Sequence, residues 1–146
     1  MYRDNIPLTV LLFIWQLPQV ITGLIVLAIF HNVKLYKNPY NHITVFSVTI
    51  PPMFGRACFS SGPFIFVCEG ATDRTYLHET GHSQQSIYLG FLFHFVVSIP
   101  SICRFWYRKI KGKSKAWYES GYPEKWANQL GGVDNLTNGV YLKVTK

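Results

Sequence analysis

With 146 residues, the chain has room for one folded domain and an appendage but not for two independent cores. Charged residues make up only 14% of it, against roughly 25% in soluble domains, so the chain either buries much of itself or meets lipid. The net charge of +7 comes without a nucleic-acid-binding motif, which excludes nucleic acid as the expected partner and favours an anionic membrane surface.

The segment 8–30, LTVLLFIWQLPQVITGLIVLAIF, contains no charged residue. Its length matches a helix across roughly 30 Å of hydrocarbon, which predicts one transmembrane helix. Pro18 predicts a kink in that helix, because proline removes one backbone hydrogen bond. Gln16 and Gln19 are unfavourable in lipid, so we expect them to bond either the protein's own domain or a partner helix in a homo- or hetero-oligomer.

Basic residues are sparse before this segment and frequent after it. Arg3 precedes it, Lys34 and Lys37 follow it, and the later stretch RKIKGKSK (108–115) adds five more. Cytoplasmic loops of membrane proteins carry the excess of lysine and arginine. The pattern therefore predicts an integral membrane protein, with everything after Phe30 on the cytoplasmic side.

The chain divides into an N-terminal transmembrane helix with its connector (1–37) and one α+β domain (38–146). The β-branched run 43–50 predicts a strand, and the stretch 54–70 predicts a hairpin with a longer loop around SSGP (60–63). Together they indicate a small, mostly antiparallel sheet. A last short strand is expected near the Asn-Gly turn at 138–139.

The three cysteines, Cys58, Cys68 and Cys103, form no CxxC pair, so thiolate metal binding is weakly supported. Cys58 and Cys68 flank the predicted hairpin and could face each other. The odd number and the cytoplasmic orientation favour reduced, structural thiols.

The sequence HETGH at 78–82 is an HExxH motif, on a helix that Thr72 or Asp73 can cap. His78 and His82 lie four residues apart, so they project from one helix face and can bind one zinc ion. Glu79 lies beside them, where it can take a proton from a water molecule that the metal activates. The small residue Gly81 allows another backbone to approach this helix closely.

A catalytic zinc of this kind needs a third protein ligand. The acidic candidates downstream are Glu119, Glu124 and Asp134. Glu124 follows Pro123, which suits the first turn of a helix, and Asn128 lies one turn later on the same face. The pair resembles the ExxxD element of gluzincin metallopeptidases, with Asn128 in place of the aspartate that orients a histidine ligand. We expect Glu124 to bind the metal, with Glu119 second and Asp134 third.

The run 87–106 is long and apolar, but it cannot cross the membrane if Glu124 is to reach the histidines on the other side. Three residues interrupt the run: His94, Pro100 and Arg104. We therefore expect a re-entrant or membrane-facing segment that turns at 98–101 and returns to the surface.

Several other polar residues lie close to the motif in the sequence. Tyr118 and Tyr122 are both candidates to donate a hydrogen bond to a tetrahedral oxyanion, and the sequence does not choose between them. His94 could be a fourth ligand or an acid, but a hydrogen-bonded core histidine is the expected role. For Gln84 and Gln85 we expect helix-surface or backbone-bonding roles.

Three stretches, WQLPQ (15–19), HETGHSQQS (78–86) and YPEKWANQLGG (122–132), together resemble short, uncharacterised bacterial membrane proteins and minigluzincin-type metallopeptidases. The resemblance covers residues 8–132. It implies zinc, two active-site helices and a strand that runs antiparallel to a bound peptide. The stretch 63–67, PFIFV, is expected to be that edge strand, to which a peptide substrate adds by β-augmentation.

These features predict a membrane-anchored zinc metallopeptidase. Zn²⁺ held by His78, His82 and Glu124 would polarise the scissile carbonyl, with Glu79 as general base and then proton donor. A peptide or membrane protein near the bilayer is the expected substrate. The alternative is a non-catalytic, membrane-anchored interaction module of a larger complex, which binds zinc structurally or binds no metal.

Overall fold

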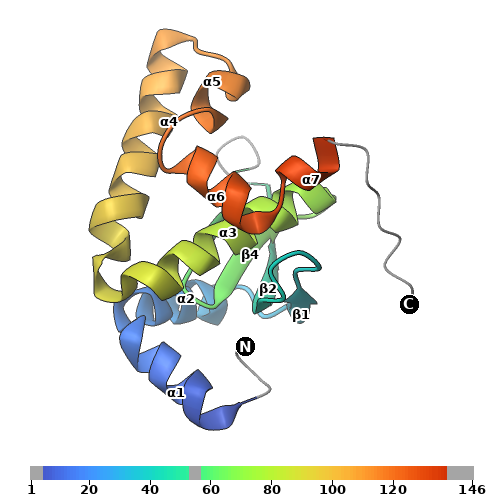
Figure 1. Cartoon of the computed structure of the whole chain (residues 1–146), viewed down its shortest axis with the longest axis vertical. Coiled ribbons are helices and arrows are strands. Elements are labelled where there is room, and N and C mark those ends of the chain that lie inside the picture. The colour runs from blue at the N-terminus through green and yellow to red at the C-terminus, as the bar shows by residue number, and fades with distance from the viewer. Residues whose placement is uncertain (1–4, 53–56, 138–146) are drawn as a thin grey trace.

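The computed structural model describes residues 5–52 and 57–137, which form a mixed α+β fold (Figure 1). The helices are α1 (Ile6–Trp15), α2 (Leu17–Ile29), α3 (Asp73–Leu89), α4 (Ile99–Lys111), α5 (Lys115–Glu119), α6 (Glu124–Gly131) and α7 (Asp134–Thr137). A 3-10 turn (Gly90–Leu92) and a π-helical turn (His94–Ser98) join α3 to α4. The strands are β1 (Val33–Lys37), β2 (Thr44–Ile50), β3 (Phe59–Ser61) and β4 (Phe64–Cys68). The predicted α+β class is confirmed, while the strand expected near 138–139 lies outside the described residues.

The four strands form one sheet in the order β1-β2-β4-β3. The β1–β2 and β4–β3 pairs are antiparallel and the β2–β4 pair is parallel, with Val48 opposite Phe66. The predicted hairpin is therefore confirmed as β3–β4, with a shorter connection than expected, Gly62-Pro63. The parallel pair at the centre was not predicted.

The prediction that the stretch 63–67 is an edge strand is wrong. It lies in β4, which is paired on both sides, and all five residues of β4 are buried. An uninterrupted apolar run is typical of an inner strand with both faces covered. The edge beside the motif helix is β3, which packs against α3.

Side chains from the two faces of the sheet enter two hydrophobic clusters. The cluster on the α3 side contains the buried residues Leu12, Ile43, Val45, Ile65 and Val67. The cluster on the α2 side contains Val20, Val48, Ile50, Phe64, Phe66 and Cys68. Alternate residues of β2 and β4 therefore face opposite helices, which fixes α3 against one face of the sheet and α2 against the other.

The continuous helix predicted over 8–30 is replaced by α1 and α2, which meet at Gln16 at an angle of 94°. Pro18 lies in the first turn of α2, where a proline needs no amide partner. The Ser86 hydroxyl donates to Gln16 Oε1 at 2.8 Å, and Gln19 Nε2 donates to the Gly90 carbonyl. Both glutamines thus bond the protein's own domain, which is one of the two expectations for them.

The run 87–106 reverses direction, as predicted, but earlier than expected. The chain bends by 119° between Leu92 and His94, whereas Pro100 lies in the first turn of α4. Gly90 begins the break with φ +50, and a Cβ at this position would lie 2.1 Å from the Trp15 ring. A residue with a side chain would fit neither this conformation nor this contact.

Within residues 5–52 and 57–137, no individual helix has both the length and the hydropathy that a membrane span requires. Two bent pairs meet the length and composition criteria together, α1 with α2 and the segment 73–92 with 94–111.

Candidate metal centre

The HExxH motif lies on α3, directly after strand β4, as the sequence predicted. Thr72 is the N-cap residue of this helix, and Asp73 is the acidic residue of its first turn, where a negative charge is favourable. The side of α3 that carries Glu79 and His82 is buried. The motif is therefore part of the interior and not of a solvated helix face.

Two glycines allow α3 and α6 to lie side by side at close range (Figure 1). A Cβ at Gly81 would lie 1.9 Å from the carbonyl oxygen of Ala127. A Cβ at Gly131 would lie equally close, at 1.9 Å, to the carbonyl oxygen of Leu77. The predicted role of Gly81 is confirmed, and the contact brings the first turn of α6 over the histidines of α3.

The three predicted ligands meet at one point. His78 Nε2 lies 3.1 Å from Glu124 Oε2, and His82 Nε2 lies 3.2 Å from the same oxygen. One ligand atom from each residue falls within 4.8 Å of the other two, so the group could hold one metal ion. Glu119 and Asp134 are not members of this group, and Glu119 instead pairs with Arg74 at 2.5 Å.

Both histidine rings are oriented by side-chain amides. His78 Nδ1 lies 2.7 Å from Asn128 Oδ1, and His82 Nδ1 lies 2.7 Å from Gln85 Oε1. Because an amide oxygen only accepts hydrogen bonds, each ring carries its proton on Nδ1 when neutral, and the Nε2 lone pair faces Glu124. Gln85 Nε2 donates to the Pro123 carbonyl at 3.1 Å, which fixes the orientation of that amide.

Asn128 was predicted in this position, but the contact of Gln85 with a ligand was not. The sequence did contain a signal for it, since His82 and Gln85 are three residues apart and residues at this spacing are neighbours on a helix. Gln84, by contrast, lies at the helix surface as expected, where it donates to the Tyr88 hydroxyl at 2.7 Å.

Glu124 is 1% exposed and carries the negative charge of the site. Burial alone would raise its pKa, but hydrogen bonds from His78 and His82 hold the pKa well below its ordinary value. Burial likewise lowers the pKa of His78, yet the hydrogen bond to Glu124 and the charge of Glu79 raise it to about 9. This carboxylate therefore favours positive charge between itself and the two rings, from protons or from a metal ion.

Glu79 is 4% exposed and is bonded on one side only. The Ser60 hydroxyl of β3 hydrogen-bonds it, while Oε2 has no partner among the described residues. Burial raises the pKa of Glu79, against the opposing charges of His78 and His82. An unpaired buried carboxylate oxygen destabilises a fold, so this atom is a candidate to meet a water molecule or a substrate.

The second oxygen of Glu124 belongs to a short hydrogen-bonded chain. The Ser101 hydroxyl of α4 donates to Glu124 Oε1, and the Tyr118 hydroxyl lies 2.9 Å from Ser101 Oγ. Burial and the charge of Glu124 raise the pKa of Tyr118, which keeps its hydroxyl protonated. The Tyr122 hydroxyl instead donates to the Val96 carbonyl at 2.5 Å, so Tyr118 is the tyrosine connected to the metal ligands.

His94 lies outside this group. It is hydrogen-bonded, as expected, but it is half-buried and not part of the core. Its Nδ1 lies 3.0 Å from Ser98 Oγ, and its Nε2 lies 3.3 Å from Thr22 Oγ1.

The three cysteines are thiols, as predicted. Cys58 and Cys68 face each other, with the Cys68 amide donating to Cys58 Sγ at 3.4 Å.

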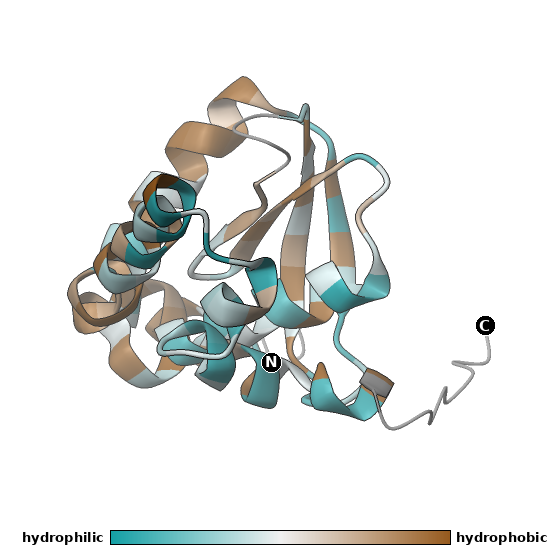
Figure 2. Cartoon of the chain, turned by 90° about the horizontal axis from the view of Figure 1, so that it is seen from above, coloured by the Kyte–Doolittle hydropathy of each residue, from teal (hydrophilic) through white to brown (hydrophobic). Residues whose placement is uncertain are grey.

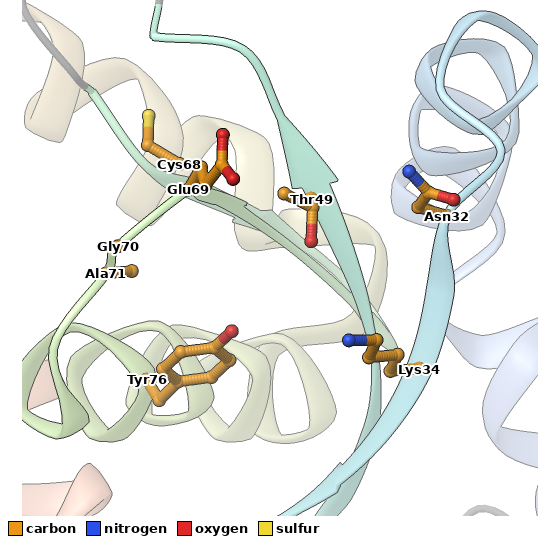
Figure 3. Close-up of a pocket in the computed structure, with 8 residues that line it drawn as sticks. All are labelled: Asn32, Lys34, Thr49, Cys68, Glu69, Gly70, Ala71 and Tyr76. Atoms are coloured by element: carbon orange, nitrogen blue, oxygen red, sulfur yellow. The ribbon is translucent and has the colours of Figure 1, made fainter.

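A cavity of about 390 Å³ lies beside Tyr76, where β4 ends and α3 begins (Figure 3). Its lining comprises Asn32, Lys34, Thr49, Cys68, Glu69, Gly70, Ala71 and Tyr76. None of the three metal-binding candidates contributes to it. The cavity is therefore distinct from the candidate metal centre.

Comparisons with protein-family models, with curated proteins and with solved structures find no match for this chain. The chemistry of the site is accordingly argued from its own residues. They provide two imidazole nitrogens, one carboxylate oxygen and a second, buried carboxyl group.

Proposed function

We propose that the protein is a zinc-dependent metallopeptidase of the gluzincin type. One observation supports this above all: His78 Nε2, His82 Nε2 and Glu124 Oε2 converge beside the buried carboxyl group of Glu79. Two histidines and one glutamate are a donor set that catalytic zinc sites use, and three protein ligands leave a position open.

The surroundings of the three atoms fit a metal ion. Asn128 and Gln85 accept from the Nδ1 atoms, so both Nε2 lone pairs are available in the direction of Glu124. Ser101 holds the other oxygen of Glu124. The ligand atoms are therefore oriented by the fold, and a metal ion would take the place of the protons between them.

A zinc ion bound here would polarise a substrate carbonyl and lower the pKa of a water molecule. The chain's own residues supply the proton transfers. Glu79 Oε2 accepts a proton as general base and returns it to the leaving amine as general acid, a role that its raised pKa suits. Tyr118 is our candidate to donate a hydrogen bond to the developing oxyanion, and Tyr122, whose hydroxyl donates to the Val96 carbonyl, is the second candidate.

For the substrate, we propose an extended peptide that pairs with the outer edge of β3, the last strand of the sheet among the described residues. Ser60 of this strand hydrogen-bonds Glu79, so a peptide along β3 would place a carbonyl near the site. The role first assigned to the stretch 63–67 thus passes to residues 59–61. A peptide or a membrane protein remains the proposed substrate class.

Membrane association on the cytoplasmic side of the bacterial inner membrane remains part of the proposal, with the lipid bilayer as a partner.

The alternative, a non-catalytic module with a structural zinc or no metal, is less favoured. A structural site has no use for a buried, half-bonded carboxylate such as Glu79, and that group reduces stability. His94, a suggested fourth ligand of such a site, is bonded to Thr22 and Ser98 instead.

The test combines metal analysis with peptide cleavage on protein purified in detergent. We expect one zinc per chain for wild type and for Glu79→Gln, and a loss of cleavage of about 10²–10⁴-fold for Glu79→Gln alone. Glu119→Gln, the same substitution outside the group, is the matched control and should keep both properties. Cleavage by Glu79→Gln at the wild-type rate would contradict the proposed reaction, and zinc-bound wild type that cleaves no peptide would favour the non-catalytic module.

A further inference from the structure

Helix α4 and the π-helical turn before it carry an apolar stripe on the side that faces away from the rest of the protein. The residues of this stripe and their exposed fractions are Phe95 70%, Ile99 50%, Ile102 57%, Trp106 53% and Ile110 77%. They follow one another at intervals of three or four residues, so they lie on one helical face. No other described segment of the protein covers this face.

The opposite side of α4 is polar and faces the domain. Ser101 donates to Glu124, Arg104 Nε donates to the Tyr118 carbonyl at 2.8 Å, and the Arg108 guanidinium lies 5.7 Å from the centre of the Tyr118 ring. A helix on the surface of a water-soluble domain has the reverse arrangement, with its apolar stripe toward the core. α4 is therefore suited to an apolar environment outside the protein.

The pair α1–α2 has the same reversed arrangement. Gln16 and Gln19 are fully buried, whereas apolar residues are exposed along both helices. The large apolar residues of these helices that are more than half exposed are Ile6 76%, Val10 54%, Leu11 62%, Ile14 57%, Ile21 51%, Ile25 59% and Ile29 65%. In Figure 1, α4 and α1 follow each other along one side of the molecule, and Figure 2 shows hydrophobic colour gathered in the helices on that side of the sheet.

The two bends of the chain are bonded to each other. Trp15 Nε1 donates to the Ile87 carbonyl at 2.9 Å, and Gln19 Nε2 donates to the Gly90 carbonyl. The α1–α2 break and the α3–α4 break therefore form one corner, held by hydrogen bonds. Each arm of α1, α2 and α4 is about 15–20 Å long, which matches one leaflet of a hydrocarbon layer of roughly 30 Å.

The charged residues near this apolar face indicate what kind of surface binds it. Neither residues 6–29 nor residues 87–113 contain an acidic residue. At the end of α4, the exposed aromatic residues Trp106 and Tyr107 are followed by the basic stretch 108–115. Aromatic rings at headgroup level and adjacent lysines and arginines are the combination that binds anionic lipid.

We propose that the exposed apolar face of α1, α2 and α4 inserts into one leaflet of a membrane that contains anionic lipid, and that neither bent pair crosses it. The two ends of the α1–α2 pair then lie on the same side as the domain, in place of the membrane crossing expected for residues 8–30. This inference does not depend on the proposed hydrolysis. If both hold, the metal centre lies one helix away from lipid, and its substrates are peptide segments at the membrane surface.

The first experiment measures flotation of the purified full chain with vesicles of phosphatidylcholine, with and without phosphatidylglycerol. We expect stronger binding to the anionic vesicles, and a fall of roughly tenfold in the bound fraction for the double variant Ile102→Asp, Ile110→Asp. The matched control is Leu35→Asp, on the exposed β1 edge, which should float like wild type. Unchanged flotation of a folded double variant would overturn the proposal, as would a dimer that buries this face and binds no vesicles.

The second experiment determines sidedness in cells. In a variant without the native cysteines, Asn5→Cys and His31→Cys flank the α1–α2 pair, and a membrane-impermeant maleimide reports the side of each. We expect both positions to react from the same side, the cytoplasmic one. Reaction from opposite sides would show that the pair crosses the membrane, and would overturn the one-leaflet arrangement without affecting the proposed metal site.

Discussion

Two clusters of buried polar side chains stand out, and they differ in charge. The candidate metal centre contains His78, His82 and Glu124, and the second cluster contains Gln16 and Gln19, which are fully buried. In the second cluster only neutral groups meet. In the metal centre, two rings converge on one oxygen of a single carboxylate, which favours a cation between them.

The hydrogen bonds of the two clusters differ as well. Gln16 donates to the Leu12 carbonyl at 3.1 Å and accepts from Ser86, so its amide satisfies both a donor and an acceptor. Glu79 Oε2, next to the candidate metal centre, has no partner among residues 5–52 and 57–137, and Gln19 Oε1 in the second cluster has none either. The unpaired atom of Gln19 is neutral, and the bonds that both glutamines make hold the bend between α1 and α2, which indicates a structural role. An unmatched oxygen on an ionisable carboxyl group indicates chemistry instead. Substitutions in the two clusters should therefore change different properties.

The largest effect is expected for Glu124→Ala. Removing this carboxylate takes away one of three ligands and the negative charge that attracts the metal, so the zinc content of the purified protein should fall from one per chain to nearly none. Metal analysis after dialysis measures this. Glu119→Ala, which removes the carboxylate that pairs with Arg74, is the control and should keep its zinc. Equal zinc content in both variants would exclude Glu124 as a ligand.

A smaller effect is expected for the two amides that orient the rings. Gln85→Leu and Asn128→Leu should each lower the affinity for zinc by about 10–100-fold while one zinc per chain still binds at saturation. Competition with a chelator of known affinity measures the change. Gln84→Leu, at the neighbouring surface position, should leave the affinity as it is. If neither Gln85→Leu nor Asn128→Leu weakens binding, the rings are oriented by their packing alone.

Much of the metal centre could be predicted because its signals are local. The spacing of His78 and His82, the proline before Glu124 and the helical turn from Glu124 to Asn128 all follow from helix geometry. Gly81 also indicated from the sequence that another segment packs closely against α3, and this segment is α6. The order of the strands was harder to predict. The apolar sequence of β4 indicates a buried strand, but it does not indicate which strands pair with it on either side.

The bend at Gln16 could not be predicted from the segment 8–30. Its partners, Ser86 and Gly90, lie about 70 residues away along the chain. Hydropathy describes the segment alone, so it assigned the unbroken apolar run to one membrane-crossing helix, with only a kink at Pro18. Only the tertiary contact shows that the glutamines face the protein while the apolar residues face outward.

The glutamine cluster yields a prediction on stability and not on metal binding. Gln16→Leu removes the acceptor for the buried Ser86 hydroxyl, which should lower the free energy of unfolding by about 1–3 kcal/mol. A chain of this size would then lose roughly 3–10 °C in Tm. Zinc content should stay at one per chain. The control is Gln129→Leu on the exposed side of α6, and an equal loss in both variants would show that the buried bond contributes nothing specific.

The smallest effect is the dependence of stability on pH, which distinguishes a site occupied by protons from the same site occupied by a metal ion. In zinc-free protein, the pKa of His78 is raised from 6.5 to about 9, so its contribution to stability is complete below pH 6.5 and is lost as the pH rises through 9. The pKa of Glu124 is lowered from 4.5, so its contribution is present above pH 4.5 and is lost only at lower pH.

Thermal unfolding with a chelator should therefore show a Tm that falls as the pH rises from 6.5 to 9. With zinc the trend should reverse, because deprotonated rings bind the metal and protons compete with it. The variant His31→Gln, which removes an exposed histidine outside the cluster, should follow wild type in both conditions. Parallel curves with and without zinc would mean that the metal does not occupy the position of these protons, and the two buried clusters would then be alike in having only a structural role.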